Sequence, residues 1–273
     1  MTTPRAKVQL TGEKETLLAT LYGRAVDSRA EDPILGDPMA ADTVRRLDHD
    51  FAKMRITPGE AAAIALRARQ LDEWTAGFLP RYEEATVVHL GCGLDSRVHR
   101  LDPGPGVRWY DIDHPEVIAL RRELSPERAG YTTIAASVTD PEWMARIPAD
   151  RPTMIVAEGL LMYLTEEDGS ALLRRLMAHT PRGELAFDAF SRFAIRSRRI
   201  NHVVVAAGAR LYWEPEDEDR REPERPGAPG HREDAGPLPS GRPRPGEGAR
   251  GTGHGTALPL PVLSGAGRGG AGR

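Results

Sequence analysis

The stretch "VVHLGCGLDSRVHRL", residues 87–101, decides the fold of this 273-residue chain. An apolar run leads into a turn that contains Gly91 and Gly93 and then into a helical pattern. Glycines let such a turn bend tightly and approach a ligand, because no Cβ stands in the way. The stretch therefore indicates a strand, a turn and a helix of the kind that holds nucleotide-like ligands, although an ordinary strand-to-helix turn has the same pattern.

Further apolar runs follow and alternate with helical patterns. The predicted strands are 86–90, 107–113, 131–136, 153–158 and 184–190. Alternation at this spacing is typical of a parallel sheet covered by helices, so we predict an α/β fold. Ligands of such sheets bind beyond the carboxyl ends of the strands, which makes the residues at the strand ends the candidates for a site.

The segment before the sheet, residues 12–82, shows helical patterns with short breaks. One helix is predicted to begin after Thr57, a suitable N-cap, because Pro58 takes the first helical position and Glu60 stands three residues after the cap. This helical pattern ends near Phe78.

The composition changes sharply after Trp213. Residues 214–273 contain no Phe, Tyr or Trp, and 24 of the 60 are Gly or Pro. Such a stretch buries too little apolar surface to offset the entropy of ordering it, and Pro259 and Pro261 exclude a central strand. We expect a disordered tail without strands, and our hypothesis is that the reading frame shifts soon after Trp213. The predicted organisation is a helical segment at 1–82, an α/β core at 83–213 and a tail at 214–273.

Composition excludes several classes of protein. The formal net charge is −3 and no stripe of Lys or Arg is present, so neither nucleic acid nor an anionic membrane is expected as a partner. The single cysteine, Cys92, excludes an intramolecular disulfide and fits a reducing compartment. The histidines show no metal-ligand spacing, and no apolar run has the length of a signal-peptide core or a membrane span. We expect a cytoplasmic protein without a bound metal.

The acid in the glycine turn, Asp95, argues against a dinucleotide. A carboxylate about 4 Å from a pyrophosphate costs on the order of 1 kcal/mol in bulk water and more in a cleft. Ser96 also replaces the third glycine of a dinucleotide loop. S-adenosylmethionine carries a sulfonium and no phosphate, and so suits an acidic turn better than NAD does. The alternative is that Asp95 caps the following helix.

Two further acids end predicted strands. Asp113 lies 20 residues after Gly93, where a carboxylate can accept hydrogen bonds from both hydroxyls of a ribose; capping of the next helix is its alternative role. Glu158 ends the fourth predicted strand, and a buried carboxylate there needs a partner. A bound ammonium or sulfonium would supply one, and so would a neighbouring arginine.

Two residues are candidates at the edge of the site. Arg67 lies on a helix before the sheet, and its guanidinium could hold the carboxylate of a cofactor. Tyr163 follows Glu158 by five residues and could point its hydroxyl into the cleft or belong to the core.

Five motifs in order resemble one family. They are "TLLATLYGRAVDSRAEDPILGDPMA", "ALRARQLD", "VVHLGCGLDSRVHRL", "WYDIDHPEVIALRREL" and "AEGLLMYL". Together they resemble the leucine carboxyl methyltransferase and polyketide O-methyltransferase family, a branch of the class I S-adenosylmethionine-dependent methyltransferases. The resemblance runs from about residue 12 to residue 213.

The resemblance implies a Rossmann-like, mostly parallel sheet of seven strands with an amino-terminal helical lid. The last two strands would here be missing or replaced by the tail. Carried over by position, Gly91 and Gly93 form the cofactor loop, Arg67 binds the cofactor's carboxylate, Asp113 holds the ribose and Glu158 lies near the methionine moiety.

The resemblance also assigns the adenine contact, and here this chain departs from the family. The family has an aspartate–leucine pair after the third strand, where this chain has Ser137 and Val138. Val138 can still pack on the base, whereas Ser137 is a poorer acceptor for the amino group, so weaker adenine binding is expected.

The function implied is an S-adenosylmethionine-dependent O-methyltransferase that acts on a carboxylate or hydroxyl of a small, polyketide-like metabolite. The sequence offers no compelling catalytic base, which favours a carboxylate acceptor, since a carboxylate needs none at neutral pH. The alternatives are a protein carboxyl methyltransferase and a catalytically impaired paralogue. An NAD-dependent dehydrogenase is disfavoured by Asp95 and Ser96.

Overall fold

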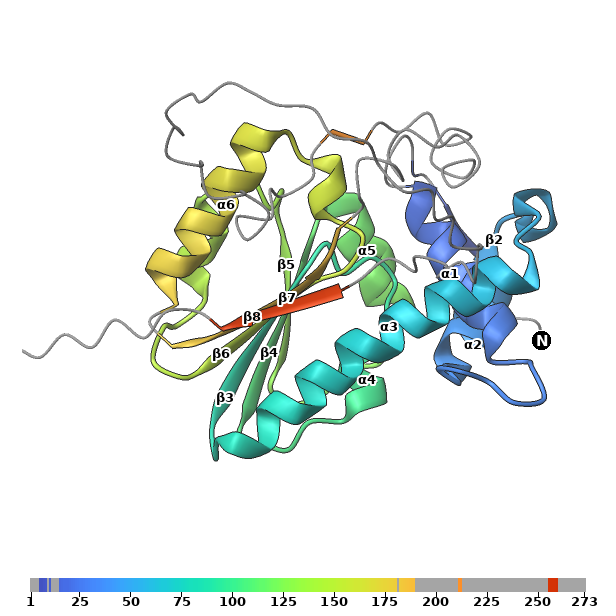
Figure 1. Cartoon of the computed structure of the whole chain (residues 1–273). Coiled ribbons are helices and arrows are strands. Elements are labelled where there is room, and N and C mark those ends of the chain that lie inside the picture. Colours follow the sequence, from blue (N-terminus) through green and yellow to red (C-terminus); the bar gives the residue numbers. More distant parts are fainter. Residues whose placement is uncertain are drawn as a thin grey trace, which may run out of the picture.

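A twisted sheet forms the centre of the chain (Figure 1). The computed structural model describes residues 5–8, 10, 15–180, 182–189, 211–212 and 255–259. The strand order of the central sheet is β5-β4-β3-β6-β7-β8. These strands are β3 (Ala85–Leu90), β4 (Val107–Asp113), β5 (Tyr131–Ala135), β6 (Thr153–Ala157), β7 (Gly183–Asp188) and β8 (Gly255–Pro259). The first five are parallel, which confirms the predicted parallel sheet and all five predicted strands.

From β3 the chain adds β4 and β5 on one side of the sheet and then crosses over to add β6 and β7 on the other. The boundary between β3 and β6 is therefore the switch point of the sheet. β3 pairs with β4 on one side and β6 on the other, so that Val87 faces both Trp109 and Met154. Every residue of β3 is buried, as expected for a central parallel strand covered on both faces. The glycine turn follows β3 directly and therefore lies at the switch point.

Helices cover both faces of the sheet. They are α1 (Thr16–Asp27), α2 (Pro38–Arg46), α3 (Pro58–Phe78), α4 (Arg97–Leu101), α5 (Pro115–Leu124) and α6 (Glu166–His179). Leu172 and Leu176 of α6 pack on one face with Val88, whereas Leu71 and Phe78 of α3 pack on the other. α3 and α6 accordingly lie on opposite sides of the sheet in Figure 1. Alternate residues of each strand supply the two cores.

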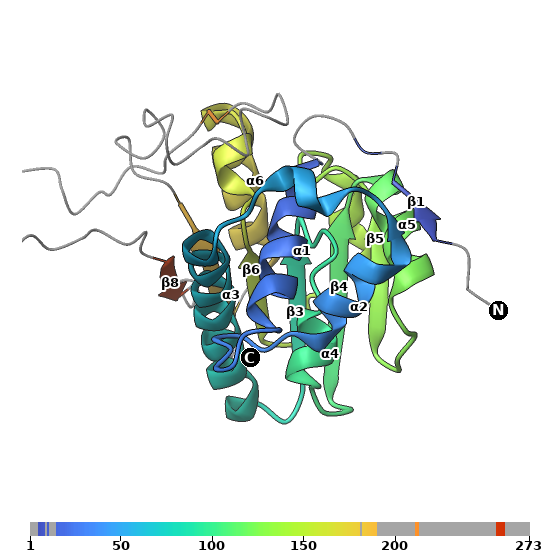
Figure 2. The ribbon, with the colours of Figure 1, turned by 90° about the vertical axis from the view of Figure 1, so that its right-hand side faces the viewer.

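The amino-terminal helices form a separate layer on the core. α1 and α2 lie side by side and share an apolar cluster with α5 (Figure 2). A short parallel pair, β1 (Ala6–Lys7) and β2 (Leu47–Asp48), completes this layer. The predicted start and end of α3 are confirmed, because Thr57 and Glu60 form a reciprocal capping box and the helix ends at Phe78.

Short 3-10 helices fill several connections. They are Phe51–Met54, Leu79–Arg81, Glu142–Arg146 and Leu161–Tyr163. The last one follows β6 and carries Tyr163.

The backbone of 255–259 corrects the expectation that the tail has no strand. β8 pairs antiparallel with β7, with Leu185 opposite Leu258 and Glu184 opposite Pro259. Pro259 ends β8, the outermost strand of the described sheet, and proline is tolerated in an edge strand because one side of the strand donates no ladder hydrogen bonds. The rest of the predicted tail, and with it the frame-shift hypothesis, lies outside the described residues.

None of the helices in the described part of the chain is long and apolar enough to cross a membrane.

The close approach of β7 to β6 depends on Gly183. A Cβ at Gly183 would overlap the carbonyl oxygen of Thr153, which is backbone and cannot rotate away. We expect Gly183→Ala to lower the free energy of unfolding by about 1–3 kcal/mol in urea titrations. The control is Gly77→Ala in α3, where the added Cβ meets nothing within 4 Å and about 1 kcal/mol of stabilisation is expected from helix propensity. Equal effects at the two glycines would contradict this packing.

Candidate functional site

The turn after β3 requires glycine at two positions. Gly91 has φ +60° and Gly93 has φ +51°, in the left-handed region that side chains disfavour. The turn is held at Gly93 from both sides: its N–H donates to Asp113 Oδ2 at 2.7 Å, and its carbonyl accepts from Arg121 Nη1 at 3.1 Å. These contacts fix the backbone that was predicted to approach a ligand.

The structure brings Asp113 from the end of β4 to the glycine turn. Its Oδ2 accepts from Gly93 N and its Oδ1 accepts from His114 N at 2.7 Å. Burial raises the pKa of this carboxyl despite the two backbone hydrogen bonds. Each oxygen has two lone pairs, so both retain capacity to accept a further hydrogen bond. Binding of a ribose by Asp113 stays a prediction.

Glu158 has arginine partners, the second of the alternatives considered for it. Arg97 Nη2 donates to Glu158 Oε2 at 2.6 Å, and Arg67 Nε donates to Glu158 Oε1 at 3.2 Å. Burial opposes ionisation, but the two guanidinium groups lower the pKa of Glu158 to about 2. Arg67 also contacts Asp188, at the end of β7, at 3.1 Å. The guanidinium of Arg67 thus lies between two carboxylates of the chain itself.

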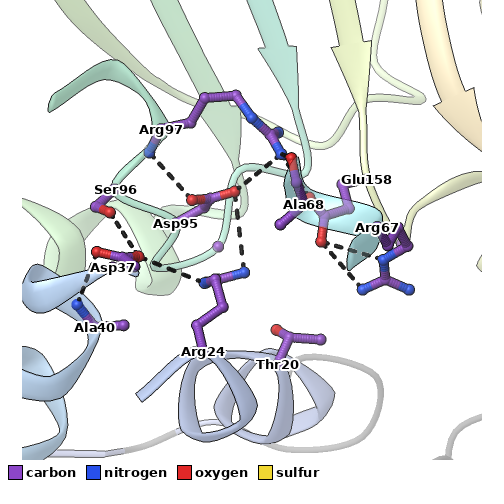
Figure 3. Close-up of polar contacts among 12 residues, drawn as sticks. Thr20, Arg24, Asp37, Ala40, Arg67, Ala68, Asp95, Ser96, Arg97 and Glu158 are labelled. Atoms are coloured by element: carbon purple, nitrogen blue, oxygen red, sulfur yellow. Dashed lines mark hydrogen bonds and ion pairs between the residues drawn. The ribbon is translucent and has the colours of Figure 1, made fainter. Parts of the chain in front are cut away.

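The acid of the glycine turn also faces arginines (Figure 3). Asp95 Oδ1 accepts from the backbone N–H of Arg97 at 3.1 Å, although the N-cap of α4 is Ser96 and not Asp95. Arg100 Nη1 lies at 3.1 Å and Arg24 Nη1 at 3.9 Å from its carboxylate. Burial disfavours the charge, but the arginines around Asp95 hold its pKa well below the usual range. The charge of Asp95 is therefore largely compensated within the chain.

These pairs belong to one connected cluster of buried charges, which we call the arginine–acid cluster. Its members are Arg24, Arg67, Arg97 and Arg100 with Asp37, Asp72, Asp95, Glu158 and Asp188. Five carboxylates against four arginines leave one surplus negative charge. The cluster joins α1 and the N-terminus of α2 to α3 and to the carboxyl ends of β6 and β7.

Several members of the cluster were not predicted as site residues. Asp188 ends β7 just as Asp113 ends β4, so the rule of strand-end acids could have found it. Asp37 caps α2 by accepting from Ala40 N at 3.1 Å and also accepts from Ser96 Oγ at 2.7 Å. The "DP" dipeptide signals the cap, but no local signal indicates the contact with Ser96, 59 residues away.

The predicted adenine end lies after β5. Ser137 Oγ hydrogen-bonds Thr139 Oγ1 at 2.8 Å, so its side chain is engaged within its own turn. Val138 is buried in the apolar core beside Trp143. Tyr163 is half-buried on the 3-10 helix after β6, near enough to Arg67 to contribute to the raised pKa of that arginine. The roles predicted for these side chains remain predictions.

A second set of buried polar side chains, centred on Asp111 and Arg121, contacts the glycine turn through Arg121. Asp111 forms an ion pair with Arg121 and accepts from Tyr131 Oη and Trp109 Nε1, both at 2.8 Å. Cys92 packs beside this group, and its burial raises the pKa of the thiol well above the usual value. A nucleophilic thiolate is therefore disfavoured. Within the described residues no group of three or more acids, histidines or cysteines could hold a metal.

Arg121 should be essential for the glycine turn and for stability. Arg121→Met removes the arginine partner of the buried Asp111 and a donor to Gly93 O, so we expect a loss of about 3–5 kcal/mol in the free energy of unfolding. The matched control is Arg122→Met, since Arg122 is on the same helix and contacts Thr133 at the surface. A loss no larger than that of the control would contradict the role of Arg121.

Stability should fall in acid because of the cluster. The pKa values of Glu158 and Asp95 are lowered in the folded state, so their contribution is complete above the unfolded pKa and is lost as pH falls through the folded pKa. Asp113 and Asp188 have raised pKa values and act in the opposite direction. We expect the free energy of unfolding to fall between about pH 5 and about pH 2, and less steeply in Glu158→Gln. Urea titrations at several pH values measure this slope, with the exposed Glu142→Gln as control; an unchanged slope in Glu158→Gln would contradict the assignment.

Comparisons with known proteins agree with the resemblance. A sequence model of the leucine carboxyl methyltransferase family matches residues 17–177. The tetracenomycin polyketide synthesis O-methyltransferase TcmP of Streptomyces glaucescens is 46% identical over 206 residues, 76% of each chain. The S-adenosyl-L-methionine-dependent methyltransferase dpfgK of Gibberella zeae is 36% identical over 248 residues, 83% of each chain.

Two methyltransferases are among the solved structures that the comparison matched to this chain. The plantazolicin methyltransferase BamL, in a complex that contains S-adenosylhomocysteine, gives a TM-score of 0.43 at 13% identity, over 73% of this chain and 71% of that chain. The N-methyltransferase NodS of Bradyrhizobium japonicum gives 0.38 at 13% identity, over 68% and 85%.

The assignment rests on the sequence matches. The family model covers more than half of the chain, and a relative with 46% identity aligns with 76% of both chains. This chain therefore belongs to the leucine carboxyl methyltransferase family and is an S-adenosyl-L-methionine-dependent methyltransferase.

Proposed function

We propose that this chain transfers a methyl group from S-adenosyl-L-methionine to an oxygen of a small, polyketide-like acceptor. The observation that carries the proposal is the surplus negative charge of the arginine–acid cluster beside a glycine turn at the switch point. A site of this charge suits a cofactor that has a net positive charge and no phosphate. The relatives' names give the acceptor class: TcmP is an O-methyltransferase of polyketide synthesis.

The residues present fit the cofactor. Asp113 retains acceptor capacity toward ribose hydroxyls, and the turn at Gly91 and Gly93 brings backbone close to the same place. Val138 offers an apolar contact for the base, and Glu158 with Asp188 supplies negative charge on the side of the methionine moiety. Arg67 positions these two carboxylates through its contacts with both.

When bound, the cofactor supplies a methyl carbon activated by a sulfonium. The work left for the chain is to orient the acceptor oxygen and to exclude water from the site. A carboxylate acceptor requires no proton transfer, whereas a hydroxyl acceptor gains from a base. The described site residues offer carboxylates that arginines or backbone N–H groups already engage, which favours an acceptor that is ionised at neutral pH.

A cytoplasmic location and the division at residues 82 and 213 remain predictions from the sequence.

Two alternatives differ from this proposal, one in the methyl acceptor and the other in the affinity for the cofactor. A protein carboxyl methyltransferase would bind the same cofactor and methylate the terminal carboxylate of a peptide. A catalytically impaired paralogue would bind the cofactor weakly, in keeping with Ser137 at the adenine position.

Cofactor binding tests the proposal first. We expect S-adenosylhomocysteine to bind the full chain in isothermal titration and NAD not to bind. Asp113→Ala should weaken S-adenosylhomocysteine by about tenfold or more, since hydrogen bonds to a charged group contribute about 1.5–3 kcal/mol. The matched control is Asp150→Ala, an exposed acid paired with Arg108.

The outcomes separate the alternatives. No binding by folded protein would exclude the enzyme and favour the impaired paralogue. If binding is found, transfer of isotope-labelled methyl is measured with aromatic carboxylates, with phenols and with peptides that end in leucine. Transfer to the peptides alone would overturn the small-molecule proposal.

A further inference from the structure

One arginine of the cluster differs from the other three. Arg24 lies on α1 and is 3% exposed, yet its Nε has no hydrogen-bond partner in the described part of the chain. Its nearest carboxylates are Asp37 at 3.8 Å and Asp95 at 3.9 Å, both beyond hydrogen-bond distance. Arg67, Arg97 and Arg100, by contrast, each donate to two or more side chains of the cluster.

This state is costly for a buried guanidinium. The group has five N–H donors and no acceptor, and burial of an ion is tolerated where hydrogen bonds replace those of water. The acids beside Arg24 are engaged elsewhere: Asp37 Oδ2 accepts from Ser96 at 2.7 Å and from Arg100 at 3.2 Å. Arg24 is thus prepared for an acceptor that the described residues do not supply.

The position of Arg24 connects it with the proposed cofactor site. Figure 3 shows its guanidinium directed from α1 toward Asp95 in the glycine turn, with Arg67 and Glu158 on the other side of the same space. Among the described residues, Asp95 Oδ2 has no hydrogen-bond donor either, and Arg97 Nη2 is an ion-pair contact at 3.5 Å. An unsatisfied guanidinium beside an unsatisfied carboxylate oxygen is the complement of a zwitterion, which carries one carboxylate and one ammonium.

We propose that Arg24 binds a ligand carboxylate, carried either by the methionine moiety of the cofactor or by the acceptor. A planar guanidinium matches a carboxylate with two parallel hydrogen bonds, which no single neutral acceptor can provide. This inference rests on the proposed function and deepens it.

The proposal differs from the assignment that the resemblance gives to Arg67. Arg67 Nε donates to Glu158 at 3.2 Å and Nη1 donates to Asp188 at 3.1 Å, while Nη2 lies 3.1 Å from Glu158. The charge of Arg67 is thus already compensated by two carboxylates at hydrogen-bond distance, whereas Arg24 has no hydrogen-bonded side-chain partner among the described residues. Arg24 also comes from the amino-terminal layer, so a ligand held by it would join α1 to the glycine turn.

The net charge of the arginine–acid cluster favours the cofactor as the source of the carboxylate that Arg24 binds. The cluster has one surplus negative charge, and S-adenosylmethionine, with a sulfonium, an ammonium and a carboxylate, has a net charge of +1. The ammonium and sulfonium would offset the surplus acid, and the carboxylate would meet Arg24. The complex would then be neutral, as a buried site favours.

The test compares ligands that differ in one group. S-adenosyl-3-thiopropylamine is S-adenosylhomocysteine without its carboxylate, and both are titrated calorimetrically onto the full chain. The variants are Arg24→Met, Arg24→Lys and Arg67→Lys, and Arg46→Met is the control because Arg46 of α2 contacts Glu123 O and Leu124 O away from the cluster. For the acceptor as the source, 2-naphthoate and its carboxylate-free match 2-naphthol are titrated onto the S-adenosylhomocysteine complex.

The expected result is that wild type prefers the carboxylate ligand of one pair by about tenfold or more, as one charge-assisted contact provides. Arg24→Met should abolish that preference, Arg24→Lys should retain part of it and Arg46→Met should leave it unchanged. The pair that responds identifies the source of the carboxylate.

Two results would overturn the inference. One is a folded Arg24→Met that keeps the wild-type preference in both pairs, which would make Arg24 a structural partner of Asp37 and Asp95. The other is loss of the preference in Arg67→Lys while Arg24→Lys keeps it at the full wild-type level. If wild type itself binds neither adenosyl ligand, the proposed function fails, which is a different and recognisable outcome.

Discussion

The contacts of Arg97 are the interaction on which the rest of the structure depends. This residue begins α4 and is fully buried, yet it donates to Asp72 of α3, to His89 of β3 and to Glu158 after β6. One guanidinium thus joins α3, the central strand β3 and the end of the neighbouring strand β6 at the switch point. Arginine suits this position because its charge persists in a buried site and its donors spread in a plane.

The arginine–acid cluster explains how one set of residues can be both scaffold and site. Ion pairs that compensate each other, such as Arg97 with Asp72, hold elements together. Where hydrogen bonding is incomplete, as at Arg24, the same cluster has capacity for a charged ligand, and Asp113, outside the cluster, retains acceptor capacity of its own. A dinucleotide would add negative charge to a cluster that already has a surplus of it, and a cationic cofactor would remove that surplus.

The local signals of the sequence predicted most of the fold. The five parallel strands, the capping box at Thr57 and the two positive-φ glycines follow from residue type, alternation and spacing, which act over a few residues. β8 escaped prediction because its segment looks unlike a strand, and it forms only by pairing with the free edge of β7.

The sequence by itself determined the parallel sheet, the glycine turn, the strand-end acids Asp113 and Glu158 and the family. Only the tertiary structure decided which charges meet: that Glu158 faces Arg67, 91 residues away, that Asp37 reaches Ser96, and that Arg24 Nε has no hydrogen-bond partner among the described residues. The reason is physical. Secondary structure follows from short-range sterics and periodicity, whereas the pairing of long side chains depends on distances between elements that packing alone sets.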